Sequence, residues 1–340
     1  MFKRLDQAYT YFDLENFTFH NGTSLPHVRL AYQVIHPHAK KVALIPTCFR
    51  GRINSTLNLA KGALQDYRII IVALFGNGES SSPSNTPGFP ELVDYRDCIR
   101  AQHALLTRLL DIQSVDVMLG FSMGGQCTYY WTAMYPHLIR NAVIVCSAAQ
   151  TSLHNYQNLE GPKSALENSI DYAPVNHRLK NLKVARGLSA FGKAYSAWLT
   201  SAEWFEKERF KDLGYETLQD WDRDVTNVNY SSWDPDDLLS MLRMWQNGSL
   251  VKCISDGKDS LESSLTRIQA RVLLMPCQSD QYFHRQASER ESHCLKNGTM
   301  EIIPSIWGHS AGTGSNQQDT NWIDQKISIF LEAGPRPTSP

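Results

Sequence analysis

The most informative segment of this chain is Gly120-Phe121-Ser122-Met123-Gly124-Gly125, which has the form G-x-S-x-G. Residues 115–119 before it are largely apolar and predict a strand, and residues 126–135 after it predict a helix. Glycines flank the serine because a Cβ at those positions of so tight a turn would collide with neighbouring backbone. We therefore expect Ser122 to project as a nucleophile from the carboxyl end of a strand.

Two other interpretations of this serine are weaker. A phosphate-binding loop would need a Lys-Ser or Lys-Thr pair after the glycines, and the chain has none there. A serine that only caps the next helix would not need glycines on both sides. The nucleophile interpretation is therefore preferred.

Short runs rich in β-branched residues predict further strands. These runs are residues 42–45, 69–73, 142–145, 272–275 and 300–303. Runs that are apolar at nearly every position are typical of a parallel sheet covered by helices on both faces. Residues 11–19 and 28–35 alternate instead and predict an antiparallel hairpin. The predicted fold class is α/β, with a mostly parallel twisted sheet flanked by helices.

Apolar residues at helical spacing predict helices at residues 92–110 and 322–331. Strand signals stop after Ser147 and resume near Ala270, with helical periodicity between them. We therefore predict a helical cap inserted after the sixth strand. The predicted boundaries are a core at 1–148, the cap at 149–268, the rest of the core at 269–333 and a flexible tail at 334–340.

The predicted cap is rich in aromatic residues, among them Phe191, Tyr195, Trp198, Trp204, Phe205 and Trp245. Most of them are expected to form the core of the cap itself. A few could line a ligand cavity beneath it.

Composition limits the classes of partner. The 340 residues include 33 Lys and Arg against 34 Asp and Glu, which leaves no basic surplus for binding nucleic acid or an acidic membrane. No run approaches the roughly 18 apolar residues of a membrane span, and the first residues do not resemble a signal peptide. The seven cysteines are dispersed singly, which indicates reduced thiols. We expect a cytoplasmic protein with a small-molecule acyl substrate, no nucleic-acid or membrane partner, and a homodimer as an open possibility.

A serine hydroxyl needs a base to activate it, and the base needs an acid to orient it. With this motif the order along the chain is Ser, acid, His. Asp280 follows the strand at 272–275 and His309 follows the strand at 300–303, so both should meet Ser122 at one edge of the sheet. Asp256 and Asp259 are weaker candidates because no predicted strand leads into them. The structural interpretation, a hydrogen-bonded core or surface residue, is preferred for His103, His137, His154, His177 and His293.

The developing oxyanion needs two backbone donors, one directly after the nucleophile and one in the loop after the third strand. The first is the amide of Met123. For the second, in the loop at 46–51, Phe49 is preferred and Cys48 is the alternative, because Pro46 has no N–H.

Taken together, these motifs resemble the α/β-hydrolase superfamily, and within it the homoserine O-acetyltransferases and their microbial relatives. The resemblance rests on residues 46–51, 75–86, 120–126, 244–248, 280–283 and 307–309. It implies the α/β-hydrolase fold and acyl chemistry, with Ser122 as nucleophile, His309 as proton shuttle, Asp280 orienting the imidazole, and Phe49 and Met123 holding the oxyanion. The acetyltransferases usually carry Gly-His-Asp where this chain has Gly308-His309-Ser310, so homoserine itself is not implied.

Three functions remain open at this stage. The preferred one is a serine hydrolase acting on a small ester or thioester through an acyl-serine. The alternative is an acyltransferase, for which acyl-CoA would be a possible co-substrate, and a non-catalytic ligand receptor on the same fold is the third. No cofactor and no metal are expected, because the chain lacks H-E-x-x-H spacing and the glycines at 76–78 lack the third glycine of a dinucleotide loop.

Overall fold

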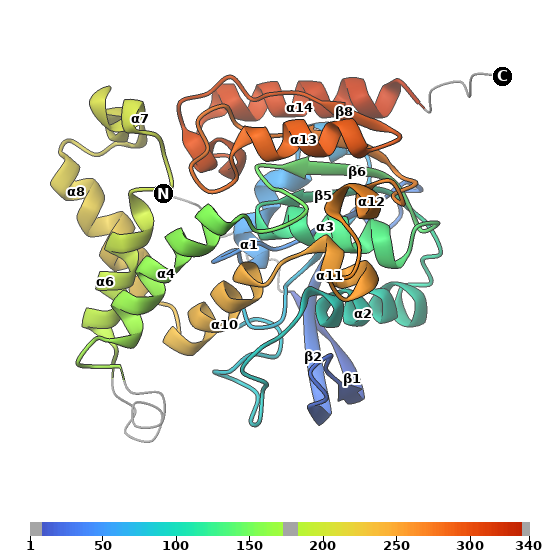
Figure 1. The fold of residues 1–340 in the computed structure, drawn as a ribbon, viewed down its shortest axis with the longest axis horizontal. Coiled ribbons are helices and arrows are strands. Elements are labelled where there is room, and N and C mark those ends of the chain that lie inside the picture. The colour runs from blue at the N-terminus through green and yellow to red at the C-terminus, as the bar shows by residue number, and fades with distance from the viewer. Residues whose placement is uncertain (1–8, 173–182, 335–340) are drawn as a thin grey trace.

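Eight strands form a single sheet in the computed structural model, which describes residues 9–172 and 183–334 (Figure 1). The strands are β1 (Thr10–Thr18), β2 (Ser24–Ile35), β3 (Val42–Pro46), β4 (Arg68–Val72), β5 (Val115–Phe121), β6 (Ile139–Val145), β7 (Arg271–Met275) and β8 (Gly298–Met300). Their order across the sheet is β1-β2-β4-β3-β5-β6-β7-β8. The strands β1 and β2 form the predicted antiparallel hairpin, and from β4 to β8 every neighbouring pair is parallel.

Helices cover both faces of the sheet, because side chains along each central strand alternate between two apolar clusters. Leu44 of β3 belongs to the cluster beneath α2 (Tyr95–Ala104) and α3 (Met123–Met134). Its neighbour Ile45 belongs to the cluster beneath α14 (Gln317–Glu332), which contributes Ile323 and Ile327. Strands buried on both faces are the arrangement that the apolar runs predicted. The predicted α/β class is confirmed.

Further helical segments complete the core. They are α1 (Ile53–Thr56), α13 (Arg285–Cys294), short 3-10 turns at Leu57–Ala60, Gly62–Leu64 and Gly308–Thr313, and a π-type turn at Leu105–Leu109 that extends α2. The helix predicted at 92–110 begins later, at Tyr95, because the side chain of Asp94 caps it and Leu92 lies outside, exposed to solvent.

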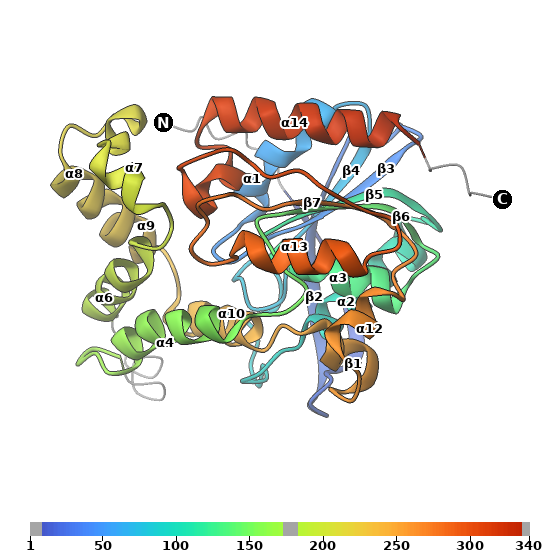
Figure 2. The ribbon, with the colours of Figure 1, turned by 45° about the horizontal axis from the view of Figure 1, so that its top comes forward.

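The insertion after the sixth strand contains helices and no strand among its described residues, as predicted; its one β-type contact is an isolated bridge between Gln150 and Ser249. It contains α4 (Leu153–Glu167), α6 (Ala185–Ser196), α7 (Ala202–Glu206), α8 (Leu218–Asp222), α9 (Asn229–Ser231), α10 (Pro235–Gln246), α11 (Leu250–Ser255), α12 (Leu261–Leu265), a 3-10 turn at Arg209–Leu213 and a π-type turn at Arg223–Val228. Figure 2 shows α6, α7 and α8 standing beside the sheet, whereas α12 lies near α2 and α3. The boundaries at 149 and 268 stay a prediction. Two helices that lie between them, α11 and α12, pack on the core helices α3 and α13.

The strand predicted at 300–303 is shifted. The regular part of β8 ends at Met300, and Ile303 makes only an isolated bridge with Cys277. Pro276 lies between β7 and Cys277 and has no N–H, so it interrupts the ladder with which residues 301–303 would pair.

Parts of three predictions lie outside the described residues: the first eight residues of the core, His177 of the cap and residues 335–340 of the tail. Within 9–172 and 183–334, no helix has both the length and the apolar character required to cross a membrane.

A buried carboxyl group fixes the point where the chain leaves β6 for the insertion. Glu291 of α13 accepts hydrogen bonds from the Tyr129 hydroxyl at 2.5 Å and from the Ala149 amide at 2.9 Å. Burial raises the pKa of Glu291 from 4.5 to about 7. Between these two values the folded protein keeps a proton that the unfolded chain has lost, so this group's contribution to stability is lost as pH rises from about 4.5 to 7.

We predict that Glu291→Gln is more stable than the wild type at pH 8, by on the order of 3 kcal/mol, because the amide keeps both partners and needs no ionisation. Thermal unfolding between pH 5 and pH 8 measures the effect. Glu289→Gln, on the same helix but partly exposed, is the control and should follow the wild type. An identical pH dependence for Glu291→Gln and the wild type would contradict the prediction.

Candidate active site

Ser122 lies at the tight turn between β5 and α3. Its backbone has φ 57° and ψ −124°, a conformation that residues other than glycine rarely adopt. A Cβ on Gly120 would lie 2.1 Å from the carbonyl oxygen of Gly124, and one on Gly125 would lie 2.4 Å from the Cβ of Ser147. The predicted need for glycines on both sides of the serine is thus a matter of space, and the turn leaves Ser122 at the carboxyl edge of the sheet.

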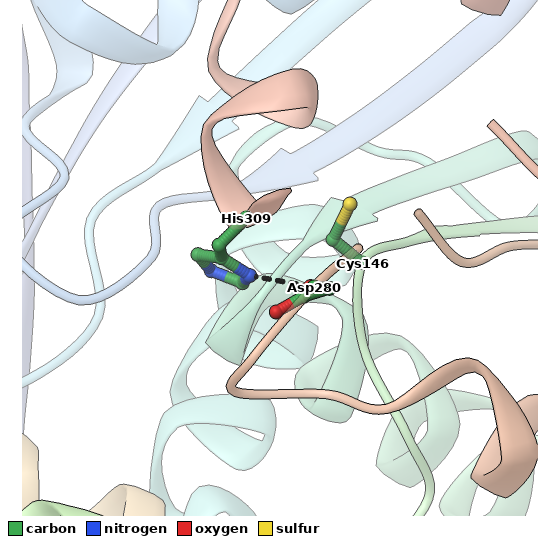
Figure 3. Close-up of side chains that lie close together, drawn as sticks. All are labelled: Cys146, Asp280 and His309. Atoms are coloured by element: carbon green, nitrogen blue, oxygen red, sulfur yellow. Dashed lines mark hydrogen bonds and ion pairs between the residues drawn. The ribbon is translucent and has the colours of Figure 1, made fainter. Parts of the chain in front are cut away.

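Asp280 and His309 meet Ser122 at this edge. Nε2 of His309 lies 2.9 Å from the hydroxyl oxygen of Ser122, and Nδ1 lies 2.8 Å from a carboxylate oxygen of Asp280. Figure 3 shows the imidazole and the carboxylate facing each other, each from a different loop. All three side chains are buried. The structure therefore brings together the three residues that the sequence selected as nucleophile, acid and base.

The hydrogen bonds determine which imidazole nitrogen carries the proton. A carboxylate can only accept, so Nδ1 of His309 donates to Asp280 and Nε2 is left to accept the Ser122 hydroxyl proton. The other oxygen of Asp280 accepts from the amides of Tyr282 at 2.8 Å and Phe283 at 3.1 Å. The carboxylate is thus fixed by its own loop, and the imidazole is oriented as a base toward the serine.

The insertion holds the loop that carries His309, a role that the sequence did not reveal. The amide of Ser310 donates to the carbonyl of Leu199 at 3.1 Å, and the Ser201 hydroxyl donates to the carbonyl of Ile306 at 2.6 Å. Gly308 has φ 59°, and a Cβ there would lie 2.8 Å from the Cα of Thr200. These contacts join residues more than a hundred positions apart, and no local pattern encodes them.

Aromatic rings surround the imidazole. The ring centroids of Phe121, Tyr282 and Phe283 lie 4.8, 5.1 and 5.7 Å from that of His309. Tyr282 and Phe283 in turn contact Trp245 of α10. Apolar packing on several sides restricts the orientation of the imidazole and its contact with water.

The loop after β3 lies beside the serine. Its tight turn is closed by a 2.8 Å hydrogen bond from the Gly51 amide to the Cys48 carbonyl. The amides of Phe49 and Met123, the predicted oxyanion donors, make no hydrogen bond to any other residue that the structure describes, and neither does the amide of Cys48. The phenyl ring of Phe49 packs against Tyr195 and Trp245, at 5.3 and 5.7 Å between centroids. The insertion thus holds this loop as well.

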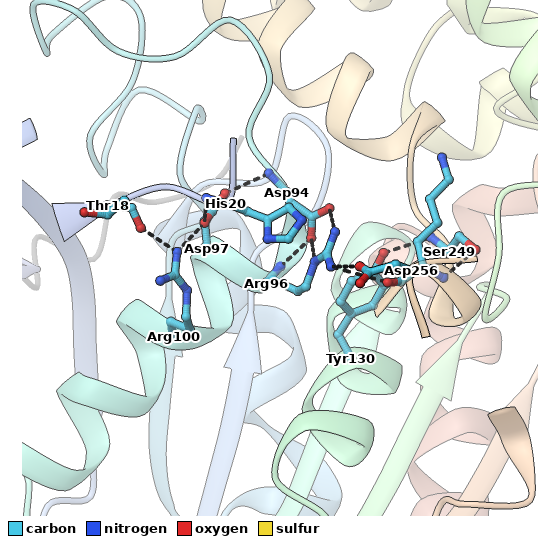
Figure 4. A network of polar contacts seen from close by, with 10 residues as sticks. Thr18, His20, Asp94, Arg96, Asp97, Arg100, Tyr130, Ser249 and Asp256 are labelled. Atoms are coloured by element: carbon cyan, nitrogen blue, oxygen red, sulfur yellow. Dashed lines mark hydrogen bonds and ion pairs between the residues drawn. The ribbon is translucent and has the colours of Figure 1, made fainter. Parts of the chain in front are cut away.

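The weaker acid candidates are engaged elsewhere. Asp256 pairs with Arg96 at 3.1 Å in a network, drawn in Figure 4, that joins α2 to α11. Asp259 pairs with Arg267 at 2.6 Å. Neither carboxylate contacts His309, so Asp280 is the acid that the geometry supports.

Within the described part of the chain, one group of three possible metal ligands lies close together: Cys146, Asp280 and His309, with ligand atoms within 4.8 Å of one another. Two of the three are hydrogen-bonded to each other, and the imidazole also contacts Ser122. Burial raises the pKa of the Cys146 thiol well above its usual value, which disfavours the thiolate that binds metals. The trio is a poor fit to a metal ion.

Ser122 and His309 open into a cavity of about 220 Å³. The insertion contributes Tyr195 and Leu199 to its wall, and the loop after β3 contributes Cys48, Phe49 and Arg50. Most of the insertion's aromatic residues are buried, but Phe191, Trp204 and Trp245 also contact rings outside the insertion, and Tyr195 lines the cavity. The sequence did not single out Arg50, although its position next to Phe49 was a usable signal.

Residues 44–312 match the family model described as alpha/beta hydrolase fold. An ethyl acetate hydrolase from Pseudomonas veronii is 30% identical over 326 residues, 92% of each chain. The solved structure of the acetyl esterase MekB is 28% identical, with a TM-score of 0.87 over 96% of this chain and 97% of that one. A homoserine O-acetyltransferase from Geobacter sulfurreducens is 26% identical over 66% of this chain and 62% of its own. The chain is thus similar to ester hydrolases and to an acyltransferase.

We predict that a fluorophosphonate probe labels the protein at Ser122, because the oriented imidazole activates this hydroxyl. Ser122→Ala should not be labelled, and Ser264→Ala, which alters a buried serine in α12 away from the turn, should be labelled like the wild type. Intact-protein mass spectrometry followed by peptide mapping identifies the modified residue. An unlabelled wild type would favour the non-catalytic receptor.

We further predict that Asp280→Asn lowers kcat by about a thousandfold or more, because an asparagine amide can donate to Nδ1 and so favour the wrong tautomer of His309. Asp256→Asn, at the rival acid, should keep kcat within about twofold. Ester hydrolysis at saturating substrate is the measurement, with circular dichroism to check folding. Near-normal turnover by folded Asp280→Asn would show that another group orients the imidazole.

Proposed function

The chain belongs to the alpha/beta hydrolase fold family, and from this premise we propose that it is a serine hydrolase of small-molecule esters or thioesters. The observation that carries the proposal is the hydrogen-bonded series Ser122, His309 and Asp280 at the wall of a small cavity. Relatives named as an ethyl acetate hydrolase and an acetyl esterase support the choice of an ester.

In the proposed reaction, the Ser122 oxygen attacks the carbonyl carbon of the ester while Nε2 of His309 takes the hydroxyl proton. Asp280 stabilises the imidazolium that forms. The negative charge that develops on the carbonyl oxygen is held by the unpaired amides of Phe49 and Met123. Collapse of this intermediate expels the alcohol or thiol, which takes the proton from His309, and leaves an acyl group on Ser122.

Water completes the cycle. His309 accepts a proton from water as the water oxygen attacks the acyl carbon. Collapse of this second intermediate breaks the bond between the acyl carbon and the Ser122 oxygen, releases the carboxylic acid, and returns the proton from His309 to the Ser122 oxygen. A cavity of about 220 Å³ lies below the usual range for drug-sized ligands, which supports an acyl group and an alcohol of a few carbon atoms each.

Acyl transfer is the second candidate, because the chain is also similar to a homoserine O-acetyltransferase. Transfer passes through the same acyl-serine and differs only in that a bound alcohol or amine, instead of water, attacks it. Acyl-CoA would then serve as the donor. Three observations favour hydrolysis. The chain is more similar to the ester hydrolases, and the match to them covers nearly the whole chain. It also has Ser310 where the acetyltransferases usually carry Asp.

We predict that the purified enzyme releases acetate from ethyl acetate without any added acceptor. Proton release at constant pH measures hydrolysis, and release of free thiol from acetyl-CoA, with and without a panel of small alcohols and amines, measures transfer. Ser122→Ala is the blank for both assays. Release that occurs only when an acceptor is present, with formation of the acylated acceptor, would overturn hydrolysis in favour of transfer.

A further inference from the structure

The cavity beside Ser122 contains one permanently charged side chain among its lining residues, that of Arg50. An arginine keeps its proton at any physiological pH. The other lining residues, among them Ser55, Asn58, Tyr195 and Thr313, carry no acidic group. The substrate cavity therefore has a net positive charge at one wall.

This cation has no anionic partner among the residues that the structure describes. No carboxylate lies within ion-pair distance of the Arg50 guanidinium, and its Nε is buried without a hydrogen-bond partner. Burying a charged donor costs free energy unless an anion or hydrogen-bond acceptors compensate it. A ligand with an anionic group would provide that compensation.

The guanidinium is also held in place. Its central carbon lies 3.9 Å from the ring centroid of Tyr230, and Tyr230 is fully buried in the insertion. Stacking on an aromatic face fixes the plane of the guanidinium without using the N–H donors at its edge. A planar guanidinium suits two parallel hydrogen bonds to a carboxylate.

A neighbouring arginine shows the contrast. Arg52 belongs to the same loop and stacks on Trp233 of the insertion at 4.3 Å, but it is not among the residues that line the cavity. Both arginines therefore link the loop to the insertion by stacking, but they differ in their position relative to the cavity. Of the two, only Arg50 combines that stacking with a position in the cavity wall.

We propose that Arg50 forms an anion subsite, so that the preferred substrates are short esters that carry one free carboxylate. The proposal rests on the proposed ester hydrolysis and narrows its substrate class. The carboxylate can belong to the acyl part, as in a half-ester of a dicarboxylic acid, or to the alcohol part, as in an acetylated hydroxy acid. In a cavity of about 220 Å³, either kind would place the carboxylate only a few bonds from the ester group.

The test compares kcat/KM for acid and neutral ester pairs. Monomethyl and dimethyl succinate place the carboxylate in the acyl part, and acetoxyacetate and methyl acetoxyacetate place it in the alcohol part. We expect the wild type to prefer the acid at least tenfold in one of the pairs, the size of one charge-assisted hydrogen bond or more. Raising the ionic strength from about 0.05 to 0.5 M should reduce this ratio, because salt screens the attraction.

Three variants separate the subsite from a structural role. Arg50→Gln should bring the acid-to-neutral ratio close to one, Arg50→Lys should keep part of it, and the control Arg52→Gln should keep the wild-type ratio. A wild type without preference in either pair, or an unchanged ratio in Arg50→Gln, would overturn the proposal. An equal fall of the ratio in Arg52→Gln would do so too, because it would indicate a general effect of stacking.

A binding experiment keeps this result separate from the proposed hydrolysis. If the wild type turned over neither these esters nor ethyl acetate, ester hydrolysis would be contradicted, and calorimetry with Ser122→Ala would still decide the subsite. A Kd at least tenfold lower for the acid than for the neutral ester in one pair, lost on adding Arg50→Gln, supports the subsite. Equal affinities in both pairs contradict it.

Discussion

The backbone turn at Ser122 is the constraint on which the site depends. A serine with a positive φ is strained, at a cost on the order of 1–3 kcal/mol, and persists only because the surroundings leave it no alternative. The surroundings here are two close approaches that only glycine permits, at Gly120 and Gly125, and a hydrogen bond from the Ser122 amide to the carbonyl of Val145. The strain is offset by the packing of β5 between β3 and β6. Because the sheet is parallel on this side, the turn shares its edge with the loops after β3, β7 and β8.

The insertion does more than cover that edge. It binds the loop of His309 through Leu199 and Ser201, and it packs against Phe49 in the loop after β3 through Tyr195 and Trp245. The two loops that the proposed reaction requires in place to within a fraction of an ångström are thus held by a segment far away in the chain. A substitution in the insertion that moves Leu199 can therefore affect the base without touching it.

This dependence connects the chemistry with the choice of substrate. The aromatic residues that position the imidazole and the oxyanion loop belong to the same packing unit that fixes Arg50 against Tyr230. The proposed anion subsite and the packing around His309 therefore rest on one set of contacts between core and insertion.

Much of this protein is determined by its sequence alone, because the signals are local. The glycines around Ser122 indicate a turn too tight for a Cβ, and the apolar runs indicate strands that are buried on both faces. The order of Ser122, Asp280 and His309 after three such strands suffices to predict that they meet, since parallel strands end at the same edge. The end of β8 was predicted wrongly, but this error too has a local cause, because Pro276 has no N–H and its position is visible in the sequence.

Only the tertiary structure decided how the insertion takes part. The contacts of Leu199 with Ser310, of Phe49 with Tyr195 and of Arg50 with Tyr230 link segments separated by about a hundred residues or more, and they arise from packing that has no periodicity to read. The pairing of Asp256, the weaker acid candidate, with Arg96 is likewise a tertiary contact that the sequence did not reveal. Local sterics and strand periodicity are encoded residue by residue, whereas the partner of a buried charge depends on which distant surfaces the folded chain brings together.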